Sequence, residues 1–118
     1  MTQGAVVKNA SDRGQVQTGK KKEKFERLQE LEDIKRILAT DYGRRFLWRL
    51  LKWTRVFESI WDQSSRIHYN AGVQDVGHFL TAEIVEANPS AYLTMMTESS
   101  KREESQQEQA VAETEPQE

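Results

Sequence analysis

Large apolar residues recur at helical spacing through the middle of the chain and are scarce at its two ends. Between Phe25 and Leu38 they return every third or fourth residue, which is the period of one face of an α-helix. A half-buried strand would instead alternate apolar and polar residues, and no such alternation extends beyond four residues. The pattern predicts a first helix over residues 20–39.

An N-cap followed by a dense apolar cluster predicts the second helix. Thr40 has the side chain of an N-cap, and Asp41 adds a negative charge near the positive end of the helix dipole. We expect this helix over residues 41–57, with an irregular connection after it. Its apolar positions are too many for one narrow stripe, so some must face a partner or a tail: Phe46, Leu47, Leu50, Leu51, Trp53, Val56 and Phe57.

Two glycines and an Asn-Pro pair characterise the last two predicted helices. A helix over residues 65–87 is expected to point these side chains inward: Ile67, Val73, Val76, Phe79, Leu80, Ile84 and Ala87. Gly72 and Gly77 each cost a helix about 1 kcal/mol relative to Ala. We expect them to allow close approach of a neighbouring helix, or Gly72 to mark a later helix start. Asn88 is the predicted cap and Pro89 the first residue of a fourth helix that ends near residue 97.

The predicted fold class is therefore all-α, a small bundle of three to four helices with disordered N- and C-terminal tails. Residues 1–19 hold three of the six glycines and are expected to form a disordered basic arm. Residues 20–97 form the predicted helical domain, and residues 98–118 a disordered acidic tail. The tail carries seven acidic residues against two basic ones, whereas residues 1–24 carry six basic residues against two acidic ones.

Several classes of function are disfavoured by what the sequence lacks. The chain has no cysteine, which excludes a disulfide framework and a thiolate metal site. His68 and His78 do not have the spacing of three or four that places two metal ligands on one helix face. No apolar run approaches the roughly 20 residues that span a bilayer, and a signal peptide is not predicted. We expect a non-enzymatic, cytoplasmic protein with no cofactor, no metal ion and no membrane span.

The segment from Gly43 to Trp53 is the strongest candidate for a binding site. As a helix it would place Phe46, Leu47, Leu50 and Trp53 on one side and Arg45, Arg49 and Lys52 toward another. Arg and Trp are favoured at protein interfaces. The predicted partner-binding residues are Arg44, Arg45, Trp48, Arg49, Lys52, Trp53, Arg55 and Trp61. In the alternative of equal weight, these arginines pair within the bundle with Glu30, Asp33 or Glu58.

A lysine-rich run before the first apolar stripe keeps nucleic acid open as a partner. Its predicted contact residues are Lys20, Lys21, Lys22 and Lys24, which would bind phosphates together with the arginines of the second helix. The acidic tail would be repelled by phosphates. A protein partner is therefore favoured over nucleic acid.

Three segments, in this order, resemble a small family of tailed-phage proteins. They are Leu38–Leu51, with Gly-Arg-Arg-Phe-Leu-Trp-Arg-Leu-Leu, then His68–Leu80, with His-Tyr-Asn-Ala-Gly, and Glu86–Tyr92, with Glu-Ala-Asn-Pro-Ser-Ala-Tyr. The resemblance covers about residues 34–97. The family usually has a charged residue before the glycine of the middle segment and basic residues after it. Here Ala71 and Val73-Gln74 occupy those positions.

Members of this family are prominent in short-tailed, podovirus-type phages and are typically encoded among head and portal genes. The resemblance implies a virion-associated or assembly-associated protein with no catalytic residues to carry over. It would be present in the host cytoplasm during assembly and then in the virion. The leading hypothesis is a protein that binds a head or portal protein in multiple copies, as a homo-oligomer on a symmetric assembly. The alternatives are a capsid scaffolding protein, a small nucleic-acid-binding protein and a host-directed inhibitor.

Overall fold

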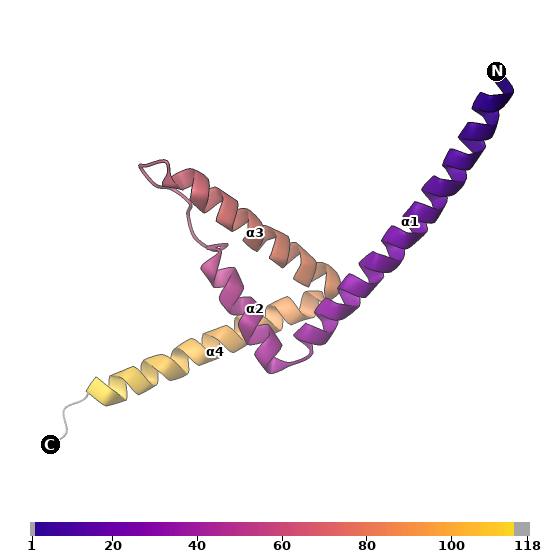
Figure 1. Ribbon diagram of the computed structural model, residues 1–118. Helices are drawn as coiled ribbons and strands as arrows, with labels where there is room; N and C mark the ends of the chain where they lie inside the picture. Colours follow the sequence, from indigo (N-terminus) through magenta and orange to yellow (C-terminus); the bar gives the residue numbers. More distant parts are fainter. Residues whose placement is uncertain (1, 115–118) are drawn as a thin grey trace. The chain divides into compact units, whose positions relative to one another are not determined.

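The computed structural model describes residues 2–114, and their side chains from residue 13 onward. It has four helices, α1 (Thr2–Leu38), α2 (Asp41–Trp53), α3 (Arg66–Ala87) and α4 (Pro89–Thr114) (Figure 1). No strand occurs within residues 2–114, so the all-α prediction is confirmed. The chain divides into two units, residues 1–33 and residues 34–118, and the division falls within α1.

In the unit of residues 34–118, α2, α3 and α4 pack against one another. The buried apolar core takes side chains from the end of α1 and from these three helices: Leu38, Trp48, Leu51, Ile84, Ala87, Ala91 and Met95. Leu51 is fully enclosed, with 0% of its surface exposed. Because the core is small, many large apolar side chains of this unit are left on its surface.

The ends of α2 are fixed by two threonines. The Thr40 hydroxyl accepts a hydrogen bond from the Gly43 N–H at 3.1 Å, which confirms the predicted N-cap. The helix ends at Trp53, earlier than the predicted residue 57. There the Thr54 hydroxyl donates to the Leu51 carbonyl at 2.7 Å. Arg55 follows with a φ of 58°, in the left-handed region, which stops the right-handed helix.

The two glycines of α3 have different surroundings. A Cβ on Gly77 would collide with Thr54 Oγ1 and Val56 Cγ2, so only glycine lets α3 approach the segment after α2 this closely. A Cβ on Gly72 would meet nothing within 4 Å. A close approach therefore occurs at Gly77, to the segment after α2 and not to a helix as predicted. The prediction was wrong for Gly72, which does not mark a helix start either, because α3 begins at Arg66.

The buried face of α3 differs from the predicted one. Val76 and Phe79 were expected to face inward, but both are exposed, Phe79 by 62%. The buried face carries Asn70 and Gly77, which were not predicted, with the predicted Ile84 and Ala87. Asn70 is tolerated there because its amide donates to the Ile60 carbonyl at 3.2 Å. The prediction was right for Ile84 and Ala87, which are buried, and wrong for Val76 and Phe79, because it followed hydrophobicity alone.

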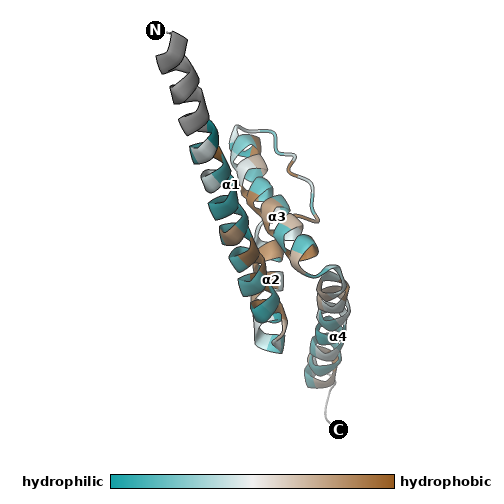
Figure 2. Ribbon diagram, turned by 90° about the vertical axis from the view of Figure 1, so that its right-hand side faces the viewer, coloured by the Kyte–Doolittle hydropathy of each residue, from teal (hydrophilic) through white to brown (hydrophobic). Residues whose placement is uncertain are grey.

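Two helix boundaries were also predicted wrongly. α1 begins at Thr2 rather than near residue 20, and α4 continues to Thr114 rather than ending near residue 97. Neither α1 nor α4 contains a proline after its first turn, so nothing of that kind interrupts either helix. The distal part of α4 is also rich in Glu, Gln and Ala, which favour a helix. Figure 2 shows these last turns of α4 as largely hydrophilic. Disorder of residues 1–19 and 98–118 in solution stays a prediction; residues 1 and 115–118 lie outside the described part.

Candidate functional site

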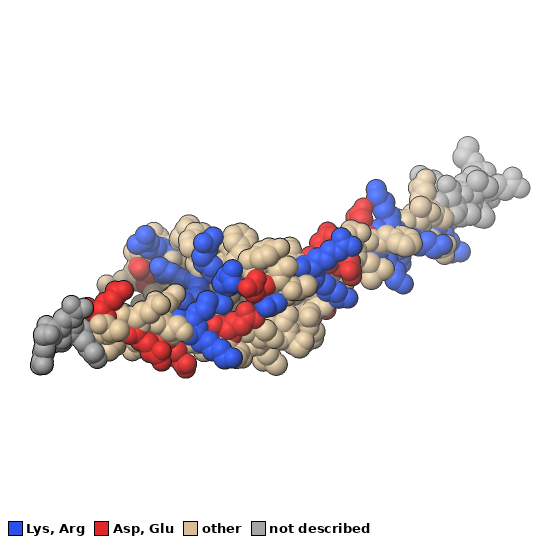
Figure 3. Space-filling view, turned by 90° about the horizontal axis from the view of Figure 1, so that it is seen from below, with Lys and Arg blue, Asp and Glu red and all other residues tan. Residues whose placement is uncertain are grey.

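An open groove of about 830 Å³ lies between the outer face of α2 and the middle of α4. We call it the basic-aromatic groove. Its lining residues on α2 are Tyr42, Arg45, Phe46, Trp48, Arg49, Lys52 and Trp53; those on α4 are Ser99, Arg102, Glu103 and Gln106. Lys and Arg side chains gather on the face of the molecule seen in Figure 3. The structure thus brings together five of the predicted partner-binding residues, Arg45, Trp48, Arg49, Lys52 and Trp53.

The aromatic side of the groove corrects the predicted orientation of α2. Phe46 and Trp53 were expected on one side with Leu47 and Leu50, apart from the bases, yet both line the groove beside those bases, and Trp53 is 66% exposed. The buried side instead contains Gly43 and Leu51. A Cβ on Gly43 would collide with the Ile37 carbonyl and the Thr40 side chain, so glycine is needed where α2 begins.

The basic side of the groove is only partly neutralised. Arg45 pairs with Asp41 at 3.4 Å, and Lys52 with Glu103 at 3.2 Å. The Arg49 guanidinium instead lies 5.5 Å from the centre of the Phe46 ring, where a cation–π attraction operates. Across the described residues, no carboxylate lies within 4.0 Å of the guanidinium of Arg49 or Arg102. Such a groove favours a ligand that carries negative charge beside apolar groups.

Asp41 stands at the first turn of α2, beside this basic side. Its carboxylate accepts a hydrogen bond from the Tyr42 N–H at 2.8 Å. That bond, together with the positive charge of Arg45, holds the pKa of Asp41 below its usual value. The carboxylate is exposed and ionised at neutral pH, so it orients Arg45 without removing its guanidinium from solvent.

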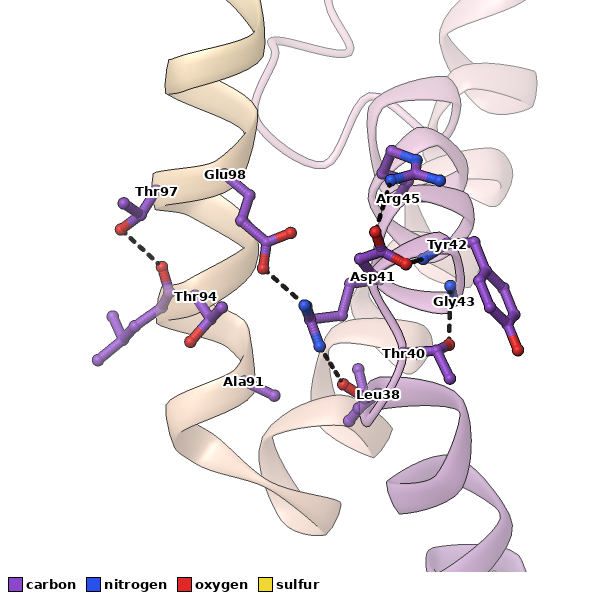
Figure 4. A network of polar contacts seen from close by, with 12 residues as sticks. Leu38, Thr40, Asp41, Tyr42, Gly43, Arg45, Ala91, Thr94, Thr97 and Glu98 are labelled. Carbon is purple, nitrogen blue, oxygen red and sulfur yellow. Dashed lines mark hydrogen bonds and ion pairs between the residues drawn. The ribbon is translucent and has the colours of Figure 1, made fainter.

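Arg44 is held inside the fold and does not line the groove. Its Nε donates to Glu98 at 2.7 Å, and its Nη1 donates to the Leu38 carbonyl at 2.8 Å (Figure 4). The side chain is 20% exposed. Internal pairing, the alternative considered for the arginines, therefore applies to Arg44, with Glu98 as the partner. Arg44 pairs with Glu98 and Arg45 with Asp41, not with the predicted Glu30, Asp33 or Glu58.

Trp48 forms the floor of the groove and belongs to the core at the same time. Its ring centre lies 5.4 Å from that of Phe57 and 6.3 Å from that of Tyr92. Its buried indole N–H has no hydrogen-bond acceptor within the described residues. Substitution of Trp48 would therefore disturb the fold and the groove together, which makes it a poor probe of binding.

The other predicted site residues lie away from the groove. Arg55 lines a smaller hollow of about 220 Å³ with Trp53, Arg66 and three residues of α3. Trp61 is 72% exposed in the connection between α2 and α3. The predicted nucleic-acid contacts, Lys20, Lys21, Lys22 and Lys24, are all exposed on α1, in the unit of residues 1–33.

Sequence reasoning missed the contribution of α4 to the groove. Three residues of α4 line the groove although they lie in the segment predicted as a disordered tail: Arg102, Glu103 and Gln106. The adjacent bases Lys101 and Arg102, which interrupt an otherwise acidic segment, were the available signal. Continuing α4 past residue 97 would have placed Arg102 opposite the arginines of α2.

The described residues show no group of three or more His, Cys, Asp and Glu side chains that would hold a metal ion. His68 and His78 are both exposed. None of the helices between residues 2 and 114 is long and apolar enough to cross a membrane.

Comparison with known proteins identifies a family. A comparison with curated proteins finds nothing similar, and neither does a comparison with solved structures. The family model described as Bbp19-like phage protein matches residues 34–97. This segment is more than half of the 118 residues, and it contains the whole buried apolar core from Leu38 to Met95. The chain belongs to the family of Bbp19-like phage proteins.

Proposed function

We propose that this phage protein is a non-enzymatic structural or accessory protein that binds a head or portal protein in multiple copies. The basic-aromatic groove is the proposed contact surface. The observation that carries the proposal is the pairing of exposed aromatic rings with unneutralised guanidinium groups on one face, with Trp53 and Arg49 as examples. Residues of these types dominate the binding energy of protein interfaces.

The arrangement of the groove on the fold also supports a binding role. Two of its aromatic residues, Phe46 and Trp53, are exposed and do not serve the core of the unit. Covering the exposed Trp53 with another surface in an assembly would remove its apolar area from water, which is favourable. Many copies on a symmetric assembly would each bury one such groove.

The first test is quantitative mass spectrometry of mature particles and of proheads from the source phage. A fixed copy number in mature particles, in a ratio that matches the portal or head protein, is the expected result. Presence in proheads alone would replace the proposal with a scaffolding role. Absence from both particles would refute a structural role of either kind.

The second test addresses the groove itself. Arg45→Glu combined with Arg49→Glu is expected to keep the fold and abolish incorporation into particles, because both side chains are exposed and line the groove. Glu104→Arg combined with Glu108→Arg reverses two exposed charges at the same spacing on α4 and is the matched control. Normal incorporation of the variant with Arg45→Glu and Arg49→Glu would exclude the groove as the contact surface.

A nucleic-acid-binding protein is the second candidate, favoured by the exposure of Lys20, Lys21, Lys22 and Lys24 on α1. Each phosphate contact releases counterions, so DNA affinity would fall steeply as salt rises. Fluorescence anisotropy with labelled duplex DNA at low and moderate salt measures this dependence. Absence of binding at low salt would eliminate this candidate.

A further inference from the structure

The chain itself carries a helix segment with the chemistry that the basic-aromatic groove requires. Within α1, residues 23–33 hold five acidic residues against two basic ones. Among them are large apolar side chains left exposed, Phe25 by 72% and Leu28 by 52%. We call residues 23–33 the acidic segment. A helix of this kind gains most of its stability from packing its apolar side, so the exposed Phe25 and Leu28 leave a surface available for packing.

The charged stripes of the two surfaces have the same spacing. Glu26, Glu30 and Asp33 recur at i, i+4 and i+7 and lie along one side of α1. On α2 the bases of the groove, Arg45, Arg49 and Lys52, recur at the same i, i+4 and i+7. Each stripe therefore extends over about two helical turns, roughly 10 Å, and three opposite charges can face each other along that length.

The apolar residues of each surface lie beside its charges. Phe25 directly precedes Glu26 in the acidic segment, and Phe46 and Trp53 directly follow Arg45 and Lys52 in the groove. An amphipathic helix in a groove is recognised by apolar anchors, with charges along its flank. Phe25 and Leu28, three residues apart, have the spacing of such anchors.

The local ion pairs of both surfaces are weak enough to be exchanged. Glu30 pairs with Arg27 at 3.0 Å, and Arg45 with Asp41 at 3.4 Å, all on exposed helix faces. Pairs of this kind contribute about 0.3–0.5 kcal/mol. Arg49 has no carboxylate partner within the described part of the chain. Replacing these local ion pairs with a contact between two copies would therefore cost little free energy.

We infer that the acidic segment of one copy docks in the basic-aromatic groove of a second copy, so that the protein self-associates before it meets any phage partner. The contact joins two different surfaces and is therefore heterologous. Copies linked in this way form a closed ring where the rotation closes and an open chain where it does not. The inference uses the same groove as the proposed function but requires no other protein.

The test is a charge exchange between two variants, measured by sedimentation velocity at increasing protein concentration. The groove variant carries Arg45→Glu and Arg49→Glu; the helix variant carries Glu26→Arg and Glu30→Arg. Each variant alone places like charges on both surfaces and is expected to be monomeric. An equimolar mixture restores opposite charges at every contact and is expected to associate as the wild type does. The control Glu104→Arg with Glu108→Arg should also associate normally.

A second pair of variants tests the apolar anchor without changing charge. Phe25→Ala is expected to weaken self-association about tenfold, as expected for the loss of an interface anchor of 1.4 kcal/mol. Val16→Ala truncates another exposed residue of α1 outside the acidic segment and should leave the association unchanged. Circular dichroism checks that the helices persist in every variant.

Three results would overturn the inference: a monomeric wild type at all concentrations, self-association of either charge variant alone, or failure of their mixture to associate. These results are separable from failure of the proposed function. The helix variant keeps an intact groove and should still enter phage particles, whereas the groove variant should lose both self-association and incorporation. A monomeric wild type whose incorporation still depends on Arg49 would refute self-association and retain the phage partner.

Discussion

The two sides of α2 have nearly the same kinds of residue and opposite roles. The inner side buries Leu51, while Arg44 bonds to Glu98 and to the Leu38 carbonyl at the edge of the core. The outer side leaves Phe46 exposed, with Arg49 over its ring. An aromatic or aliphatic residue next to an arginine thus stabilises the fold on one side and remains available for binding on the other. Residue type alone does not separate the two roles; the packing of α3 and α4 does.

The largest expected effect comes from truncating the enclosed core on the inner side. Leu51→Ala should lower the free energy of unfolding by about 2–5 kcal/mol, because it removes packed atoms and leaves a cavity. Phe46→Ala on the outer side should change it by about 0.5 kcal/mol or less. Urea unfolding followed by circular dichroism measures both. Equal effects would mean that the two sides of α2 do not differ as the structure shows.

A glycine pair in α3 provides the next comparison. Gly77→Ala should destabilise the protein by about 1–3 kcal/mol, since its methyl group would press on Thr54 and Val56. Gly72→Ala adds the same methyl group in open space and should stabilise the helix by up to about 1 kcal/mol. Thermal unfolding should therefore shift in opposite directions. A shift in the same direction for both variants would contradict the close contact at Gly77.

The sequence predicted the sites where local chemistry decides the structure. Thr40 caps α2 and Asn88-Pro89 opens α4, because a cap requires only residues close in the chain. It did not predict that Phe79 lies outside and Asn70 inside, since that depends on which surfaces α3 meets. For the same reason, the sequence predicted the α2 side of the groove but not its α4 side. Its α2 residues are local to one helix, whereas Arg102 reaches it only because α4 packs alongside.

Two of the three arginines of α2, Arg44 and Arg49, should show a smaller and reciprocal contrast. Arg44→Ala should lower the free energy of unfolding by about 1–3 kcal/mol, because it leaves partly buried acceptors on Glu98 and Leu38 without their donor. Arg49→Ala should cost about 0.5 kcal/mol or less but weaken binding in the groove. Unfolding and self-association are measured on both proteins. Strong loss of association with Arg44→Ala in a folded protein would place Arg44 in the contact surface.

The smallest expected effect is a pH-dependent change in thermal stability that comes from Asp41, in the first turn of α2. Its pKa is lowered in the folded protein from the usual 3.8, first by the Tyr42 N–H and then by Arg45. A lowered pKa means that the ionised form stabilises the fold, so this contribution is complete above the unfolded pKa and is lost as the pH falls through the folded one. Asp41→Asn should therefore melt slightly below the wild type at neutral pH, and the difference should vanish in strong acid.

Thermal melts of both proteins over a series of acidic pH values measure this dependence. Asp62 provides the matched control, because its pKa is lowered by Ser64 in the connection after α2, away from the groove arginines. Raising the salt concentration should shrink the part of the Asp41 effect that comes from Arg45, since exposed charges are screened, and leave the part from the Tyr42 hydrogen bond. A difference between Asp41→Asn and the wild type that persists below both pKa values would show that the carboxylate charge is not its source.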